Sequence, residues 1–552
     1  MNVRHTVMTC AGVLALAGCT DSSAGPSPLP SCGAHGTQLT LAVGAYTSID
    51  PGSDSGCVTF AANTAPDTAE YLVLPWSGGG TPGSSAPFVL QSAAPVASIS
   101  LSRFAPGGGN PRGATSLAFD HFLRELARSR RYPPADRSAP AVSAGVPQPS
   151  PAAGPPVVGS KRTFKVCTTL TCAPTVNVGA VARALGTHIA IYIDTLAPAP
   201  GLSASDLDSL KTVFDQRLYP LDTTTFGHVS DIDSNTVVIV LMTNQVNKLV
   251  TAADCNKPGG GYVAGFFFPG DLDPAFAASY NNGEIFYSIV ADSTGTLSCA
   301  HKPSDVRYYT PVTFTHEFQH MISFVEHVLV RNGNSEEGWL DEGLSKYAEE
   351  IAGRSFGDNA HFSQYAFGDA YDSYHYLLAT GDSPLLIPAD NGTLAMVGAS
   401  WLFTRYIVDQ FGDSLPGKLV RTTLTGASNV AAQTGQPFAL TVSRWALTNW
   451  VSDLPGFSAP SELQYKSWHF HTTFPSLHSQ DPADFPLAYP LVPTFSPGNA
   501  VNISGTLRTG SGEYVRAVQP AGGAAFTLHF SANGTTAVSP AVVPRLNVVR
   551  IR

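Results

Sequence analysis

The stretch TPVTFTHEFQHMISFVEH, residues 310–327, carries two histidines four positions apart, with a glutamate directly after the first. Its apolar residues recur at the spacing of one helix face, so His316 and His320 should lie one turn apart on another face. Two imidazoles in that arrangement can bind one tetrahedral zinc ion. Glu317 can then accept a proton from a water molecule that the metal activates. We therefore predict one zinc ion per chain, with Glu317 as the general base.

The boundaries of this helix follow from its flanking residues. Thr310 suits a helix cap, Pro311 suits the first helical position, and Asn332-Gly333 is a favourable end. The chain has 12 glutamates, and seven of them lie between positions 317 and 350. A capped, solvated helix would account for some of these glutamates but not for the histidine pair.

A second helix, GWLDEGLSKYAEE at residues 338–350, offers the third metal ligand. Glu342 and Glu349 are seven positions apart and share a helix face. We predict Glu342 as the ligand, with Asp341 as its competitor. Glu349 would then orient one of the ligand histidines from behind.

The two helices resemble those of the gluzincin metallopeptidases, a group that includes thermolysin and the zinc aminopeptidases. Within this group the sequence is most similar to the hyicolysin family of secreted bacterial peptidases. The resemblance covers roughly residues 160–415 and rests on five segments: 316–320, 339–350, 237–242, 261–270 and 399–412. It implies an α+β catalytic domain with a mixed sheet lobe, the HExxH helix and a helical lobe. It also implies a zinc endopeptidase that acts on protein or peptide substrates. By the same resemblance, segment 284–291 would be an edge strand with which the substrate backbone pairs; an ordinary buried strand is the alternative.

The sequence departs from the group's pattern at several positions. Thermolysin has an aspartate four residues after the ligand glutamate, where this chain has Lys346. The aminopeptidases carry a tyrosine three residues before a Gly-Ala pair, where this chain has Ala395. Their amine-binding motif is absent, which favours an endopeptidase. The group that would stabilise the oxyanion is left open among Tyr371, Tyr374, His375, Tyr376 and Tyr406.

The N-terminus has the layout of an export signal. A short basic region precedes a short apolar run and the sequence Leu16-Ala-Gly-Cys19. This ending resembles the lipobox of bacterial lipoproteins, which implies cleavage before Cys19 and acylation of its thiol. An ordinary signal peptide that contains a cysteine is the alternative. We expect an exported bacterial lipoprotein of the cell envelope or cell surface, which meets the membrane through its lipid anchor only.

Composition limits the classes of partner. Charged residues make up 13% of the chain, about half the usual share, and the formal net charge is −10. No extended run of Lys or Arg is present, which argues against nucleic acid as a partner. We expect a monomer.

Changes in composition divide the 552 residues into domains. We expect small β-sandwich-like modules to flank the catalytic domain. The predicted boundaries are a signal peptide at 1–19, a tether at 20–32, an N-terminal β-rich domain with one helix at 33–131, a Pro/Ala-rich linker at 132–160, the metallopeptidase domain at 161–480 and a C-terminal β module at 490–552.

Six cysteines remain after Cys10 and Cys19 are set aside. An even number in an exported chain favours disulfides, and pairing between neighbours (32–57, 167–172 and 255–299) is the simplest arrangement. Two aspartate-rich segments, 231–235 and 271–273, have oxygen ligands suited to Ca²⁺, although Asp-rich turns are usually only turns.

Two other functions remain open from the sequence. One is a surface-anchored binding lipoprotein with a non-catalytic zinc site; against it, a structural site would be closed by four protein ligands and would not need Glu317. The other is a zinc hydrolase of a non-peptide amide, because the same chemistry serves both substrates.

Overall fold

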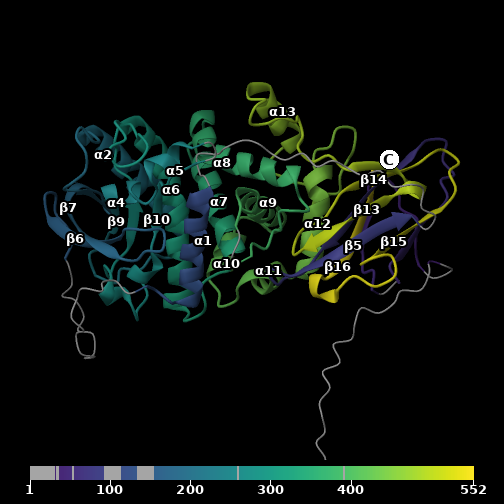
Figure 1. Cartoon of the computed structure of the whole chain (residues 1–552), viewed down its shortest axis with the longest axis horizontal. Coiled ribbons are helices and arrows are strands. Elements are labelled where there is room, and N and C mark those ends of the chain that lie inside the picture. The colour runs from purple at the N-terminus through teal and green to yellow at the C-terminus, as the bar shows by residue number, and fades with distance from the viewer. Residues whose placement is uncertain are drawn as a thin grey trace, which may run out of the picture.

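The chain folds into a six-stranded sheet, a central group of helices and a β-sandwich, which follow one another along its long axis (Figure 1). This arrangement confirms the predicted α+β class. The predicted signal peptide with Cys19, the tether up to residue 31 and most of the linker lie outside the described residues. The computed structural model describes residues 32, 36–52, 55–92, 114–133, 154–257, 260–388 and 392–552.

The six-stranded sheet is mixed. β8, β9 and β11 run parallel, whereas β10 pairs antiparallel with β11 and forms one edge. Of the two interpretations of segment 284–291, the buried strand is confirmed and the edge strand is wrong: β11 lies inside the sheet, and all four of its residues are buried, as is usual for a strand paired on both sides. The strands, in spatial order, are β10 (Gly265–Phe267), β11 (Ile285–Ser288), β9 (Val238–Met242), β8 (Ile189–Asp194), β7 (Thr175–Leu185) and β6 (Lys161–Cys167).

Helices cover this sheet and fill the middle of the molecule (Figure 1). The α-helices are α1 (Ala114–Ser129), α2 (Ala204–Val213), α3 (Tyr219–Thr225), α4 (Asn244–Asn247), α5 (Ala252–Asn256), α6 (Pro303–Phe324), α7 (Gly338–Ser355), α8 (Asn359–Leu378), α9 (Leu394–Phe411), α10 (Leu415–Val420), α11 (Gly426–Thr434), α12 (Phe438–Val451) and α13 (Phe470–Gln480). Two π-helical segments continue α2 and α6, at Phe214–Leu218 and Val325–Val330.

The HExxH helix α6 is longer than the sequence predicted. It begins at Pro303, where the backbone N–H of Lys302 donates to Asp305, and it continues through Pro311. The predicted start at Thr310 is wrong: Pro311, which was expected at the first helical position, stands inside the helix. The predicted end is close to the observed one: the π-helical segment stops at Val330, and Asn332 has a positive φ of 53°.

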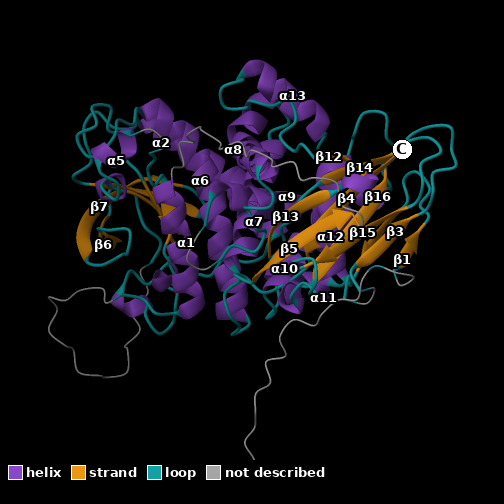
Figure 2. Cartoon of the chain, turned by 45° about the vertical axis from the view of Figure 1, so that its right-hand side comes forward, coloured by secondary structure: helices purple, strands orange, loops and turns teal. Residues whose placement is uncertain are grey.

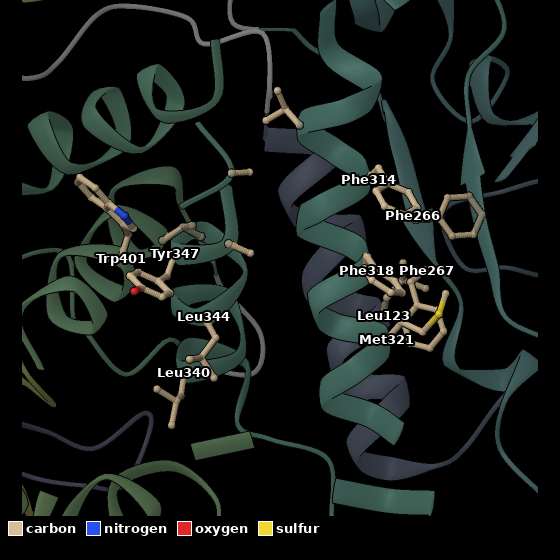
Figure 3. Packing of buried hydrophobic residues seen from close by; sticks show 14 of the residues in the cluster. Leu123, Phe266, Phe267, Phe314, Phe318, Met321, Leu340, Leu344, Tyr347 and Trp401 are labelled. Carbon is tan, nitrogen blue, oxygen red and sulfur yellow. The ribbon is translucent and has the colours of Figure 1, made fainter. Parts of the chain in front are cut away.

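Helix α1 packs on the six-stranded sheet and α6 rather than on the N-terminal β-rich domain in which it was predicted. The ring of Phe119 meets that of Phe266 on β10 at 5.1 Å, and Tyr132 meets Phe268 at 5.8 Å. Leu123 is fully buried beside α6 (Figure 3). The apolar face of α1, which the sequence predicted correctly, is therefore covered by the sheet and helix α6.

The two predicted β modules form one sandwich (Figure 2). Each sheet combines strands from both ends of the chain; for example, β15 lies between β3 and β5. The prediction of two modules was wrong because pairing between strands more than 400 residues apart leaves no local pattern in the sequence. One sheet contains β1 (Thr37–Leu39), β3 (Cys57–Phe60), β15 (Phe526–Ser531), β5 (Ser85–Ser92) and β13 (Asn502–Arg508); the other contains β12 (Thr494–Pro497), β14 (Val515–Gln519), β4 (Ala69–Ser77), β16 (Pro544–Arg550) and β2 (Tyr46–Ile49).

All three predicted disulfides are present: Cys32–Cys57, Cys167–Cys172 and Cys255–Cys299. They agree with an extracellular or envelope location. Within the described residues, no helix is long and apolar enough to cross a membrane.

Candidate metal centre

The structure brings together the side chains of His316, His320 and Glu342. The Nε2 atoms of the two histidines are 3.2 Å apart. The carboxylate of Glu342 lies 3.4 Å from Nε2 of His316 and 3.5 Å from Nε2 of His320. The two carboxylate oxygens of Glu342 thus face the two histidines between α6 and α7, with Oε2 nearest His316 and Oε1 nearest His320.

Packing on both helices turns these side chains toward one another. Phe314 and Phe318 occupy the side of α6 that faces Phe266 on β10, which leaves the histidines on a different side (Figure 3). On α7, a Cβ atom at Gly343 would lie 2.3 Å from Oγ1 of Thr404 on α9. Glycine at this position therefore permits the close approach of α7 and α9 that holds Glu342 in place.

A carboxylate behind each histidine fixes its ring. Nδ1 of His316 lies 2.8 Å from Oε1 of Glu349, and Nδ1 of His320 lies 2.9 Å from Oδ2 of Asp341. With a proton on each Nδ1, both hydrogen bonds are made and both Nε2 lone pairs point to the shared centre. Asp341, the competing ligand in the sequence analysis, thus lies at the back of His320, and Glu342 faces both Nε2 atoms.

The donor set fits a zinc ion. Ligands bound at 2.0–2.1 Å in tetrahedral geometry are roughly 3.3 Å apart, close to the three separations found here. The three residues are 4%, 1% and 6% exposed, so little water can reach the donors. Burial lowers the pKa of His316, but hydrogen bonds to Glu342 and Glu349 outweigh this effect and raise it to about 10. Metal binding would have to displace that proton.

A buried cation supports Glu349 from behind. Nζ of Lys346 lies 3.6 Å from Glu349, 3.3 Å from Asp369 and 3.3 Å from Asp372. Lys346 is the residue at which the sequence departs from the thermolysin pattern. Its charge offsets three buried carboxylates, one of which holds His316.

Glu317 is held by two donors from outside the predicted site. Its Oε2 accepts a hydrogen bond from the backbone N–H of Phe267 on β10 at 3.1 Å. Nη2 of Arg124 on α1 lies 3.5 Å from the same oxygen. Arg124 could not be predicted as a site residue, because a polar position on an amphipathic helix 193 residues away carries no sign of this contact.

A cavity of about 320 Å³ opens beside the metal centre and is lined by His316 and Glu317. Aromatic side chains of α6 and α8, among them Tyr309 and Phe367, line much of its wall. Asp120 of α1 also lines it. Burial and the nearby charges of Glu317 and Glu342 raise the pKa of Asp120 to about 8. The cavity thus combines an aromatic wall with the ionisable groups of the metal centre and with Asp484.

Of the five downstream candidates for the oxyanion donor, Tyr371 lines this cavity. Burial, followed by nearby aspartates, raises its pKa to about 12, so its hydroxyl keeps a proton at neutral pH. The hydroxyls of Tyr374 and Tyr406 donate to the carbonyls of Leu487 and Glu462. His375 contacts the carbonyl of Tyr371 through Nδ1, and the ring of Tyr376 stacks on Trp445.

The two segments predicted to hold Ca²⁺ differ in whether protein donors already use their carboxylate oxygens. Both oxygens of Asp273 accept from Arg130 at 2.6 Å, and Asp271 accepts from the Tyr287 hydroxyl and the Asn281 N–H. The oxygens of this pair are thus used by protein donors. Asp231 and Asp233 instead lie close to a third carboxylate, that of Glu284.

Comparison with models of known protein families found no match, and comparison with curated proteins found no matching sequence. The chemistry of the side chains therefore carries the functional interpretation.

Proposed function

We propose that this protein is a zinc-dependent endopeptidase of the gluzincin type that hydrolyses peptide bonds of extracellular proteins. One observation carries the proposal: three buried donors lie at tetrahedral spacing, and Glu317 adjoins them at the wall of an open cavity. Three protein ligands leave a fourth position for water or substrate, as a catalytic zinc site requires. A purely structural site gives no role to a base held at the cavity wall.

Zinc, when bound, acts as a Lewis acid that lowers the pKa of water and polarises the scissile carbonyl. Glu317 accepts a proton from the attacking water and delivers it to the leaving amine nitrogen. The Phe267 N–H and Arg124 hold its carboxylate in place for both transfers. Tyr371 donates a hydrogen bond to the carbonyl oxygen as negative charge develops on it.

The edge strand β10 offers a site for the substrate backbone. The N–H of Phe267 points away from β11, because it donates to Glu317. In an antiparallel ladder alternate residues face the same way, so Gly265 also presents its backbone groups to the free edge. Gly265 lines the cavity, and an extended peptide can pair there as an added strand. The substrate would then lie across the metal centre.

The proposal also covers where the protein acts and how it is anchored. The three disulfides support export, and the lipobox-like ending at Cys19 supports a lipid anchor in a bacterial envelope. A tethered peptidase of this kind would act on proteins outside the cytoplasm.

The test compares residues 32–552 of the wild type with Glu317→Gln and with the control Glu462→Gln, whose side chain contacts Tyr46 far from the cavity. Unfolded casein is the substrate, and bound zinc is measured in each protein. We expect Glu317→Gln to keep its zinc and to lose about 10²–10⁴-fold in kcat, while the control cleaves like the wild type. Equal cleavage by all three proteins would refute the role of Glu317. A wild type that binds zinc but cleaves neither casein nor a peptide library would refute the endopeptidase.

A further inference from the structure

Three carboxylates meet at the end of the six-stranded sheet where β9 and β11 begin. Asp231 and Asp233 come from the loop before β9, and Glu284 directly precedes β11. One oxygen from each residue lies within 4.8 Å of the others. Asp231 is exposed, whereas Asp233 is 8% exposed and Glu284 is fully buried. None of the three is part of the zinc centre.

The backbone holds these carboxylates in position. Asp231 accepts from the N–H of Thr236 at 3.1 Å, and Asp233 accepts from the N–H of Asn235 at 3.2 Å. Oε1 of Glu284 accepts from the hydroxyl of Ser230 at 2.6 Å and from the N–H of Ile232 at 3.0 Å. The loop therefore closes around the Glu284 side chain.

Positive charge at this cluster is scarce. Among the described residues, the cationic side chain that pairs with the cluster is that of Arg162, 3.0 Å from Asp233. The second oxygen of Glu284, Oε2, is buried and has no hydrogen-bond partner in the described part of the chain. A buried carboxylate oxygen without a partner costs several kcal/mol unless a cation or donor meets it. Burial raises the pKa of both Asp233 and Glu284, and the charge of Asp233 raises that of Glu284 further.

We propose that Asp231, Asp233 and Glu284 bind one Ca²⁺ ion. The donors are all oxygens, and carboxylates from a loop together with one from a distant segment are a usual calcium ligand set. Three carboxylates against one arginine leave a net charge of about −2, which a divalent cation neutralises. Calcium at the millimolar concentration found outside cells would suit an exported chain, for which dissociation constants of about 10⁻⁴–10⁻³ M are typical.

The site would stabilise the sheet whose edge strand β10 holds the proposed base Glu317. The carbonyl of Glu284 accepts from the N–H of Ile239 on β9, and β11 pairs directly with β10. The Phe267 N–H of β10 in turn holds Glu317. An ion at Glu284 therefore fastens the loop to the strands beside the metal centre, and this inference does not depend on the proposed peptidase activity.

The test measures ion binding and thermal unfolding of the full chain, with stoichiometric zinc present throughout. Tb³⁺, a hard cation that prefers oxygen ligands as Ca²⁺ does, serves as the luminescent probe. We expect Tb³⁺ luminescence that Ca²⁺ displaces, and a rise in Tm of roughly 2–4 °C at 5 mM Ca²⁺.

Two variants and a control locate the binding. Asp231→Asn keeps an oxygen for the Thr236 N–H and lies at the surface, so it should fold; Glu284→Gln keeps the acceptor for Ser230. We expect each variant to raise the dissociation constant at least tenfold and to abolish most of the Tm shift. The control Asp208→Asn, in an exposed pair with Lys211, should bind like the wild type. The proposal would be overturned if Asp231→Asn kept an unchanged Ca²⁺ response, or if the wild type did not respond to 10 mM Ca²⁺. The choice of calcium would be overturned if the wild type responded to Mg²⁺ as strongly as to Ca²⁺.

Discussion

The guanidinium group of Arg124 lies 3.5 Å from the carboxylate of Glu317 and 3.9 Å from that of Asp341. The side chains of Arg124 and Glu317 are 4% and 3% exposed, so water screens their interaction weakly. One side chain of α1 therefore touches both the proposed base and the residue that orients His320. Helix α1 is a part of the candidate site rather than a neighbour of it.

Replacing Arg124 with alanine should lower kcat about 10²-fold, because Glu317 loses the donor that holds it and small misplacements of a reacting group have effects of this size. Zinc content is measured alongside, because Arg124 also lies 3.9 Å from Asp341, which holds His320. The measurement is peptide cleavage by the zinc-loaded protein. Arg128→Ala is the matched control, because this residue of the same helix contacts the carbonyl of Ser335 instead. A higher kcat for Arg124→Ala than for the wild type would contradict this prediction, because it would mean that Arg124 restrains Glu317.

Replacing Asp341 with asparagine should weaken zinc binding by roughly 10–100-fold, the usual effect of losing a carboxylate behind a ligand histidine. The His320 ring would exchange a charged acceptor for the neutral amide oxygen of asparagine, which holds the proton on Nδ1 less strongly. Competition with a chromogenic chelator measures the affinity. Asp413→Asn, a change in the exposed turn after α9, serves as the control. An affinity equal to that of the wild type would mean that Asp341 does not set the orientation of His320.

Replacing Tyr371 with phenylalanine should lower kcat by about 10²–10³-fold, as the loss of one oxyanion donor does in other hydrolases. KM should change little, because the hydrogen bond strengthens only as charge develops. Tyr374→Phe on the same helix is the control, since its hydroxyl donates to Leu487 rather than facing the cavity. If both variants keep full kcat, the donor is another group.

The buried carboxyl of Asp222 should make stability depend on pH. Burial raises its pKa well above the ordinary value of 3.8, although the Thr315 hydroxyl, 2.8 Å away, lowers it somewhat. Above pH 3.8 the unfolded chain has lost this proton while the folded chain keeps it. The free energy of unfolding therefore falls as pH rises, by up to about 1.4 kcal/mol per pH unit, until the folded group ionises as well.

Asp222→Asn removes this slope, because asparagine stays neutral and still accepts from Thr315. Urea unfolding at several pH values above 4 measures the difference between variant and wild type. We expect that difference to shift in favour of the variant as pH rises. If the difference in unfolding free energy between variant and wild type stayed the same at every pH, Asp222 would already be ionised in the folded protein.

Much of the local structure could be predicted because its causes are local. The apolar stripe of α1 predicted residues 115–130, and the structure has Ala114–Ser129. The sequence offers Ser203 or Ser205 as the cap of α2, and the structure has Ser203, whose side chain accepts from the backbone N–H of Asp206. The start of α6 was predicted poorly because Pro311 can stand inside a helix when the surrounding helices and sheet stabilise it.

Pairing over long distances could not be predicted. β15 lies between β3 and β5, and nothing in the 400 residues between them records that contact. The same holds for β10 as the edge strand: three apolar residues, Gly265–Phe267, have no periodicity that distinguishes an edge from an interior position.

The sequence by itself determined the chemistry of the candidate site, because helical spacing alone places His316 beside His320 and Glu342 on the face shared with Glu349. Only the tertiary structure decided that Glu342 rather than Asp341 faces both Nε2 atoms, that Arg124 reaches Glu317, and that both ends of the chain share one sandwich. The physical reason is the distance along the chain over which each effect acts. Helix periodicity acts over a few residues and is visible in the sequence, whereas burial and ion pairing act between segments that only the folded chain brings together.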